Sequence, residues 1–422
     1  MIRRYFLFGL ITLLFSVSVY AQYEQTGGFA RLRGIGNNPY VVDPYFMTVN
    51  PAWGGHYQNF IFGDLGSNPI GAPGWNSGGI GQFVGANFHL GRGFSLGAML
   101  TRNDFNGFSI GSLDPFSAAG PGAGVISSVN FIIPDAVIPM NNNLELMGSI
   151  KSGNSAFGLG IAYASTNNEF APDTGAGAIG SASQLGFNAG VVAELSGSFM
   201  IDLGASLMLP SATFEPPAGN NTEASQTIIL VNARAFWQYS SRLAFVPSVA
   251  FMTASGTVDN GTTATTTTTD LISFTFIAAG FGFNYQVGDF LLAGGPGFAS
   301  VSATQSSTET SPELTISAFV FPVWNLGVEW DLADWLVGRF GYVAANASVT
   351  IEEPASVNTV NEFIMTQYFP LGATVGVGFM LGNFTLDATV NEDVLRQGLN
   401  NLGGNGPGAN TFAYLSLSYA MP

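Results

Sequence analysis

Short segments in which apolar side chains alternate with polar or small ones recur along most of this chain. In residues 325–330, Leu326, Val328 and Trp330 alternate with Asn325, Gly327 and Glu329. A period of two places the two sets on opposite faces of a β-sheet. The same alternation recurs in residues 184–193, 336–342, 384–391 and 411–421. These segments predict strands whose larger apolar side chains share one face, which we expect to be the outer one.

Two kinds of connection separate the predicted strands. Tight turns are expected near residues 91–93, 152–154, 196–198, 240–242, 287–289, 331–334 and 382–383. Long loops are expected near residues 67–79, 103–142, 165–181, 210–224, 257–269, 305–313, 351–364 and 392–410. Because the two kinds alternate, the pattern predicts an all-β fold, a transmembrane antiparallel β-barrel of about 14–16 strands over residues 57–422.

The composition agrees with a chain that faces lipid and disagrees with several other classes. Charged residues make up 9% of the chain, against about 25% in soluble domains. The net charge of −16 disfavours a nucleic-acid partner, and the absence of cysteine excludes disulfides and thiolate metal sites. A soluble β-helix or β-sandwich would require a fixed-length repeat or polar outer faces, and neither is present.

The first 21 residues have the pattern of a cleavable signal peptide. Arg3 and Arg4 precede an apolar stretch at residues 5–15, and a small-x-small site ends at Ala21. With the barrel pattern, this predicts export to the bacterial outer membrane, with its lipid as surroundings.

Residues 22–56 are expected to form a plug inside the barrel. Between residues 29 and 55, three prolines and four glycines interrupt any regular strand. The same stretch is rich in large apolar side chains, namely Phe29, Tyr40, Tyr45, Phe46, Met47 and Trp53. These side chains require burial, and the barrel interior is the nearest site for it.

This N-terminal region resembles that of the FadL-like family of long-chain fatty-acid and hydrophobic-compound outer-membrane transporters. Gly34 and Gly36, followed by Asn50-Pro51-Ala52 just before the first strand, match the family's Gly-rich stretch and Asn-Pro-Ala element. The resemblance implies a hatch inside a barrel of roughly 14 strands and a hydrophobic small-molecule ligand. The Tyr/Pro-rich stretch at residues 39–46 departs from the family's small and acidic residues.

Candidate chemistry is sparse. His56 and His89 are the two histidines in the chain, and neither accompanies a recognisable nucleophile motif. The sequence therefore predicts no enzyme, no metal site and no cofactor.

The period-two alternation predicts that five charged side chains face the lumen. They are Asp202, Arg234, Glu329, Arg339 and Asp387. Arg102 is a further candidate. An arginine facing lipid at the bilayer midplane would cost about 2–4 kcal/mol. These groups could pair with one another and with Arg31, Arg33 and Asp43 to fix the plug, which we favour. Alternatively, Arg234 or Arg339 could bind the carboxylate of a ligand.

Three functions remain in competition. The favoured hypothesis is a transporter that admits hydrophobic, fatty-acid-like molecules through the plugged lumen. The second is a structural or secretion-accessory barrel that docks a partner protein through external loops, above all the apolar loop 103–142. The third is a general porin, which the small number of lumen charges disfavours.

Overall fold

The structure is a computed structural model that describes residues 27–64, 83–101, 143–170, 177–260, 267–270, 273–305, 313–353, 356–362, 372–390 and 412–422. The predicted signal peptide, loop 103–142 and Arg102 lie outside these ranges.

Short helical elements precede a long series of strands. The first are α2 (Phe29–Gly34) and the 3-10 helices η1 (Pro44–Thr48) and η2 (Pro51–Gly55). Strands of 5–10 residues then form β1 (Phe60–Asp64), β2 (Phe83–Gly91), β3 (Phe94–Thr101) and β4 (Asn143–Ser152). Longer strands follow: β5 (Ser155–Phe170), β6 (Ala178–Ser196), β7 (Phe199–Glu215), β8 (Thr222–Gln238), β9 (Leu243–Asn260), β11 (Ser273–Val287), β12 (Phe290–Gln305), β13 (Leu314–Ala333) and β14 (Leu336–Glu353). The remaining strands are β10 (Thr267–Asp270), β15 (Ser356–Glu362), β16 (Gly372–Leu381), β17 (Phe384–Val390) and β18 (Phe412–Ala420).

No helix in the described ranges has both the length and the apolar content of a membrane span.

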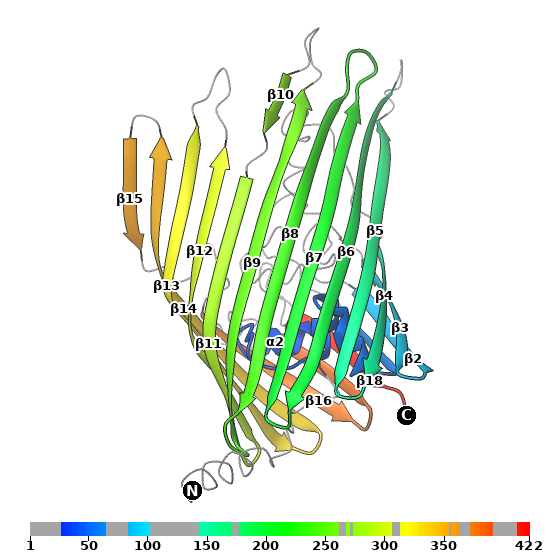
Figure 1. Ribbon diagram of the computed structural model, residues 1–422, viewed down its shortest axis with the longest axis vertical. Helices are drawn as coiled ribbons and strands as arrows, with labels where there is room; N and C mark the ends of the chain where they lie inside the picture. Colours follow the sequence, from blue (N-terminus) through cyan, green and yellow to red (C-terminus); the bar gives the residue numbers. More distant parts are fainter. Residues whose placement is uncertain are drawn as a thin grey trace, which may run out of the picture.

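The strands close into a single antiparallel barrel (Figure 1). Each strand pairs with its sequence neighbour, and β1 pairs with both β2 and β18. The short β10 and the long β11 pair successively along β9, and β15 and β16 do the same along β14. Counting each of these two pairs once, the described residues form a closed barrel of 16 strands, which confirms the fold class and the upper of the two predicted strand counts.

The seven predicted tight turns are the hairpin connections at one end of the barrel. At two of them, Gly288 and Gly382 have φ angles of 57° and 63°, a left-handed conformation that glycine adopts without a steric penalty. The chain's last residues lie at the same end (Figure 1), where the Met421 N–H donates to the carbonyl of Asn59. Several strands extend farther at the other end than expected. Residues 210–215 belong to β7 and 222–224 to β8, because Ser/Thr alternation continues the ladder there.

The outer face of the barrel carries a band of exposed large apolar side chains. Leu159, Phe281, Phe321 and Leu381 are each more than half exposed. Trp237 and Trp330 lie near the tight-turn ends of β8 and β13, and Trp335 lies in the turn between β13 and β14. Interfacial aromatic residues are expected at this height in membrane barrels. A continuous apolar outer surface of this kind is that of a barrel that spans a membrane.

Candidate functional site

The segment before β1 forms a plug, residues 27–59, inside the lower part of the barrel near the tight-turn end (Figure 1). Two Asx-Pro pairs shape it. The Tyr45 N–H donates to Asp43 Oδ1 at 2.8 Å, and the Ala52 N–H donates to Asn50 Oδ1 at 2.9 Å. Each side chain caps a 3-10 turn whose first residue is a proline, a position where the missing N–H costs no hydrogen bond.

The plug is buried along almost its whole length. Every residue from Tyr40 to Gly55 is buried, and Met47, Ala52 and Trp53 have no exposed surface. They belong to one apolar cluster with wall residues such as Met99, Met147, Val192, Met200, Phe236 and Val246. The apolar side chains of the plug are thus buried against the inner wall, which fills the lumen at this height.

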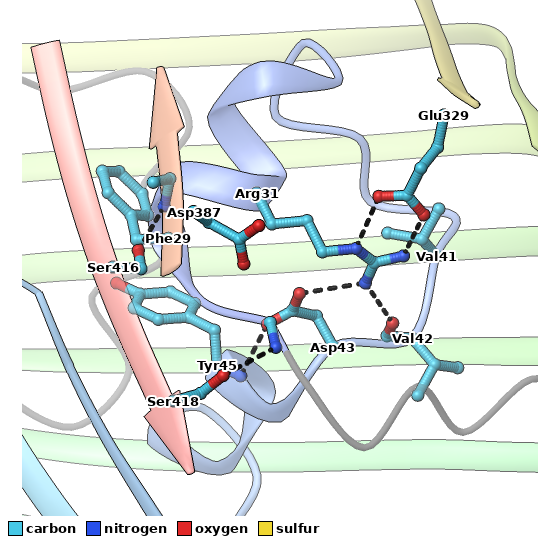
Figure 2. Close-up of polar contacts among 12 residues, drawn as sticks. Phe29, Arg31, Val41, Val42, Asp43, Tyr45, Glu329, Asp387, Ser416 and Ser418 are labelled. Carbon is cyan, nitrogen blue, oxygen red and sulfur yellow. Dashed lines mark hydrogen bonds and ion pairs between the residues drawn. The ribbon is translucent and has the colours of Figure 1, made fainter. Parts of the chain in front are cut away.

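A first set of charges, the Arg31 cluster, joins α2 to the wall. It consists of Arg31, Asp43, Glu329, Arg339 and Asp387. Figure 2 shows Arg31, Asp43, Glu329 and Asp387. The Arg31 guanidinium donates to both carboxylate oxygens of Glu329 at 2.8 and 2.9 Å and to Asp43 at 3.0 Å. From the neighbouring strand, Arg339 donates to Glu329 at 2.5 Å and to Asp387 at 2.6 Å. Three carboxylates therefore share two buried guanidinium groups.

A second set, the Asn50 cluster, joins the Asn-Pro-Ala element to β7 and β8. The Asn50 amide donates to Asp202 at 2.6 Å, and the Trp53 indole N–H donates to the same carboxylate at 3.1 Å. Arg234 forms an ion pair with Asp202 and donates to the plug carbonyls of Pro39 and Val41 at 2.9 and 3.0 Å. The Arg234 guanidinium also lies 3.8 Å from the ring centroid of Phe46.

A third contact supports the start of α2. The Asp64 carboxylate accepts from the Phe29 N–H at 3.1 Å, and Ser416 accepts from the Ala30 N–H at 2.7 Å while donating to Asp64 at 2.6 Å. Both wall residues are buried. The first strand and the last strand thus meet at the plug, next to the barrel seam.

Wall glycines provide the space in which the plug sits. A Cβ on Gly190 would overlap the Asn50 amide, and one on Gly158 would overlap the backbone of Pro51 and Ala52. On the other side of the lumen, Gly282 lies under the ring of Tyr40. Many of the glycines in strand interiors therefore mark the close approach of the plug backbone to the wall.

Burial shifts the acidity of two plug side chains. It raises the pKa of Asp43 from 3.8 to about 6, although the Arg31 charge and the Tyr45 N–H act in the opposite direction. Burial also lowers the pKa of His56 to about 4, with the nearby Lys151 charge adding to the effect. The His56 ring is therefore neutral at pH 7, with Nδ1 3.4 Å from Lys151 Nζ.

Beyond the plug, toward the loop end, the inner wall becomes apolar. We call this surface the apolar belt. It consists of Met208, Ile228, Leu230, Met252, Ala254, Phe276, Ala299, Val320, Ala345 and Ala347, all buried and all on β7–β14. Met208 shares the inward face of β7 with Asp202, and Ile228 pairs with Met208 across the ladder. No plug residue belongs to this cluster.

The predicted site residues lie in these clusters. Glu329, Arg339 and Asp387 belong to the Arg31 cluster, and Asp202 and Arg234 to the Asn50 cluster. Of the predicted hatch motif, Asn50, Pro51 and Ala52 lie against β5–β7, whereas Gly34 and Gly36 lie against β14 and β16. Gly36 has a φ of 74°. Arg33 joins neither cluster and lies over the Phe29 ring. Whether any of these residues binds a ligand stays a prediction.

Sequence reasoning missed the apolar belt. The larger apolar side chains of the strands were expected to share the outer face. The overlooked signal is the run Ile228-Ile229-Leu230-Val231, which is apolar on both faces of the strand. Such runs are typical of strands buried on both sides.

The described residues contain no cluster of three or more His, Asp or Glu side chains that could hold a metal ion.

No family model and no curated protein sequence matches this chain. Among solved structures, it is similar to the toluene transporter TbuX of Ralstonia pickettii, with 11% identity, a TM-score of 0.38, and coverage of 95% of this chain and all of that one. A TodX monoaromatic hydrocarbon channel mutant gives 9% identity, a TM-score of 0.39, and coverage of 93% and 98%. The FrpB iron transporter of Neisseria meningitidis gives 10% identity and a TM-score of 0.38, and this chain spans 62% of its length. Likenesses this distant bear on neither family nor substrate.

Proposed function

We propose that this chain is a non-catalytic transporter of the bacterial outer membrane that admits hydrophobic small molecules through its plugged lumen. The observation that carries the proposal is the apolar belt, which lies on the inner wall of the seven long strands β7–β9 and β11–β14, just beyond the plug. A barrel that conducts water and ions has a polar interior. An inner wall of Ile, Leu, Met and Phe instead favours an apolar solute, because contact with it removes apolar surface of both partners from water.

The plug accounts for the exclusion of polar solutes. It fills the lumen at the tight-turn end and is bonded to the wall through Asp202, Glu329 and Ser416. A general porin would keep a water-filled path at this height, so the seated plug disfavours that alternative. The partner-docking alternative depends on loop 103–142, which lies outside the described residues.

The proposal is tested by the compounds that copurify with the protein. We expect mass spectrometry of organic extracts to find an apolar compound in roughly stoichiometric amount, enriched over another barrel protein prepared in the same detergent. The double variant Ile228→Asn/Met252→Gln, which places amides in the belt, should lose the compound. Thr227→Asn, on the outer face of the same strand, should retain it. The absence of any enrichment in the wild-type extract would contradict the proposal.

A further inference from the structure

Three polar side chains lie on the inner wall between the plug and the apolar belt. Asn188 of β6 pairs with Ser206 of β7 across the ladder, and Ser206 pairs with Leu230 of the belt. Asn232 of β8 pairs with Gly204, which is the next inward position on β7 toward the plug. We call Asn188, Ser206 and Asn232 the polar step.

Asn188 and Ser206 of the polar step are buried and Asn232 is half-buried, yet each has a buried polar atom without a partner among the described residues. The exposed fraction of Asn188 is 6% and that of Ser206 is 3%. Asn188 Oδ1, Ser206 Oγ and Asn232 Nδ2 have no hydrogen-bond partner among the described residues. Buried polar groups in folded proteins are nearly always hydrogen-bonded, so three neighbouring exceptions require an explanation. Together they offer one acceptor, one donor and a hydroxyl with both capacities.

The polar step borders the plug on one side and the belt on the other. A Cβ on Gly204 would lie 3.2 Å from the plug carbonyl of Val49. In the opposite direction, the next inward residue after Ser206 is Met208 of the belt, which pairs with Ile228. Successive inward positions on a strand are about 7 Å apart. A molecule with a polar head on the step would therefore place its body on the belt.

The charges near the step select against an anionic head. Neither the step nor the belt contains a charged side chain. The nearest carboxylate on β7 is that of Asp202, two inward positions from Ser206. It is paired with Arg234, which also donates to two plug carbonyls. Arg31 and Arg339 are likewise bonded to carboxylates. Among the described residues, a ligand carboxylate at the step would meet no cation that is not already paired, and burial of an unpaired charge is strongly unfavourable.

We propose that the polar step and the apolar belt form one binding site for an uncharged amphiphile, whose hydroxyl or carbonyl head bonds Asn188, Ser206 and Asn232 and whose apolar body lies on the belt. This inference rests on the proposed function and narrows its substrate class. It differs from the alternative of a carboxylate contact at Arg234 or Arg339, because the head group is neutral.

The test compares three probes of equal chain length: 1-dodecanol, dodecanoate at pH 8 and dodecane. Binding of each labelled probe to the full-length protein in nanodiscs is measured by equilibrium dialysis against empty nanodiscs. We expect dodecanol to bind at least tenfold more tightly than dodecanoate. Asn188→Ala and Ser206→Ala, made separately so that one folding failure does not remove the test, should each weaken dodecanol binding severalfold and leave dodecane binding unchanged. Asn346→Ala, on the outer face of β14, is the matched control and should change nothing.

The outcomes separate the two proposals. Binding of dodecanoate as tight as that of dodecanol would overturn the neutral-head inference and leave hydrophobe transport intact. Unchanged dodecanol binding in both folded step variants would mean that the step plays no part in recognition, and would also overturn the inference. If none of the three probes binds, both the neutral-head inference and the proposed function are contradicted. Folding of each variant is checked by its heat-dependent shift in gel mobility.

Discussion

At the scale of single residues, the lumen is organised by buried guanidinium groups. Arg31 is almost fully buried and is bonded to two carboxylates and a carbonyl. Removing one partner from such a buried pair typically costs about 3–5 kcal/mol, because the other charge stays buried and unpaired. Arg31 of the plug and Glu329 of the wall are 298 positions apart, so their pairing fixes how the plug sits rather than how a strand folds.

Asp43 makes the stability of this arrangement depend on pH. Its pKa is raised from 3.8 to about 6, so the folded protein binds a proton more tightly than the unfolded chain does. Protonation of Asp43 therefore stabilises the folded state increasingly as the pH falls from 7 toward 4. This stabilisation is lost as the pH rises through 6. Arg31, Asp64 and Asp387 are the charged groups that face it. We expect the heat-induced gel-shift midpoint of the wild type to rise between pH 7.5 and pH 5.

Asp43→Asn isolates that contribution. The amide does not titrate, so the variant should show a smaller rise over the same interval, measured in the same detergent and ionic strength. Parallel curves for the two proteins would show that Asp43 does not titrate in this range.

The inward placement of the charges was predictable residue by residue. Glu329 lies between Val328 and Trp330, and alternation alone turns it inward. Its partners were not predictable, because Arg31 and Arg339 reach it from separate elements whose relative positions depend on barrel closure. The unsatisfied atoms of Asn188 and Ser206 were also beyond prediction, since alternation gives the face of a side chain and not its hydrogen bonds.

At the scale of elements, the strands and the plug were predictable to different extents. Turn chemistry and period-two alternation located the hairpins, and β1 begins at Phe60, next to the predicted plug boundary. The plug's internal structure was less accessible, because its prolines and glycines exclude a regular strand without specifying the 3-10 helix η2 that Asn50 caps. The belt was missed because the inward face was expected to be polar along the entire strand.

The seat of the plug can be tested with one glycine. In Gly190→Leu the new side chain would overlap the Asn50 amide and displace Asn50 from β6 and β7. In planar bilayers we expect the wild type to be nearly silent and this variant to conduct at least tenfold more. A variant lacking residues 29–50 gives the reference value for an open lumen.

Gly148→Leu is the matched control, because Gly148 faces outward on β4 and a Cβ there would lie 3.6 Å from Phe94. It should be as silent as the wild type. Equal conductance of Gly190→Leu and Gly148→Leu would contradict the close seating of the plug.

At the scale of the whole molecule, the strands are longer than a membrane span requires, and the character of the inner wall changes along them. A membrane-spanning strand requires about 9–11 residues, whereas β6 and β13 have 19 and 20. At the height of the belt, the outer face is apolar as well: Ile229, Ile277 and Phe319, which are next to belt residues along their strands, are exposed. Farther toward the loop end, Ser225 and Thr227 face outward on β8 and Gln226 faces inward. The wall is therefore apolar on both faces at the belt.

The belt and the plug together treat apolar molecules and polar solutes differently. An apolar molecule that enters from the loop end reaches the belt before the plug, and the plug then separates it from the tight-turn end. A polar solute gains nothing from the belt and meets the same plug. The central claim is that the lumen is open to the former and closed to the latter.

The most direct test measures both fluxes in the same cells. Intact protein is expressed in a bacterium whose lipopolysaccharide excludes the dye N-phenyl-1-naphthylamine and whose periplasm contains a β-lactamase. Dye fluorescence reports apolar uptake, and nitrocefin hydrolysis reports polar uptake. The account predicts a severalfold faster dye signal than in Ile228→Asn/Met252→Gln cells, with nitrocefin hydrolysis at the level of cells without the protein. Faster nitrocefin hydrolysis with an unchanged dye signal would instead identify an open porin and contradict the account.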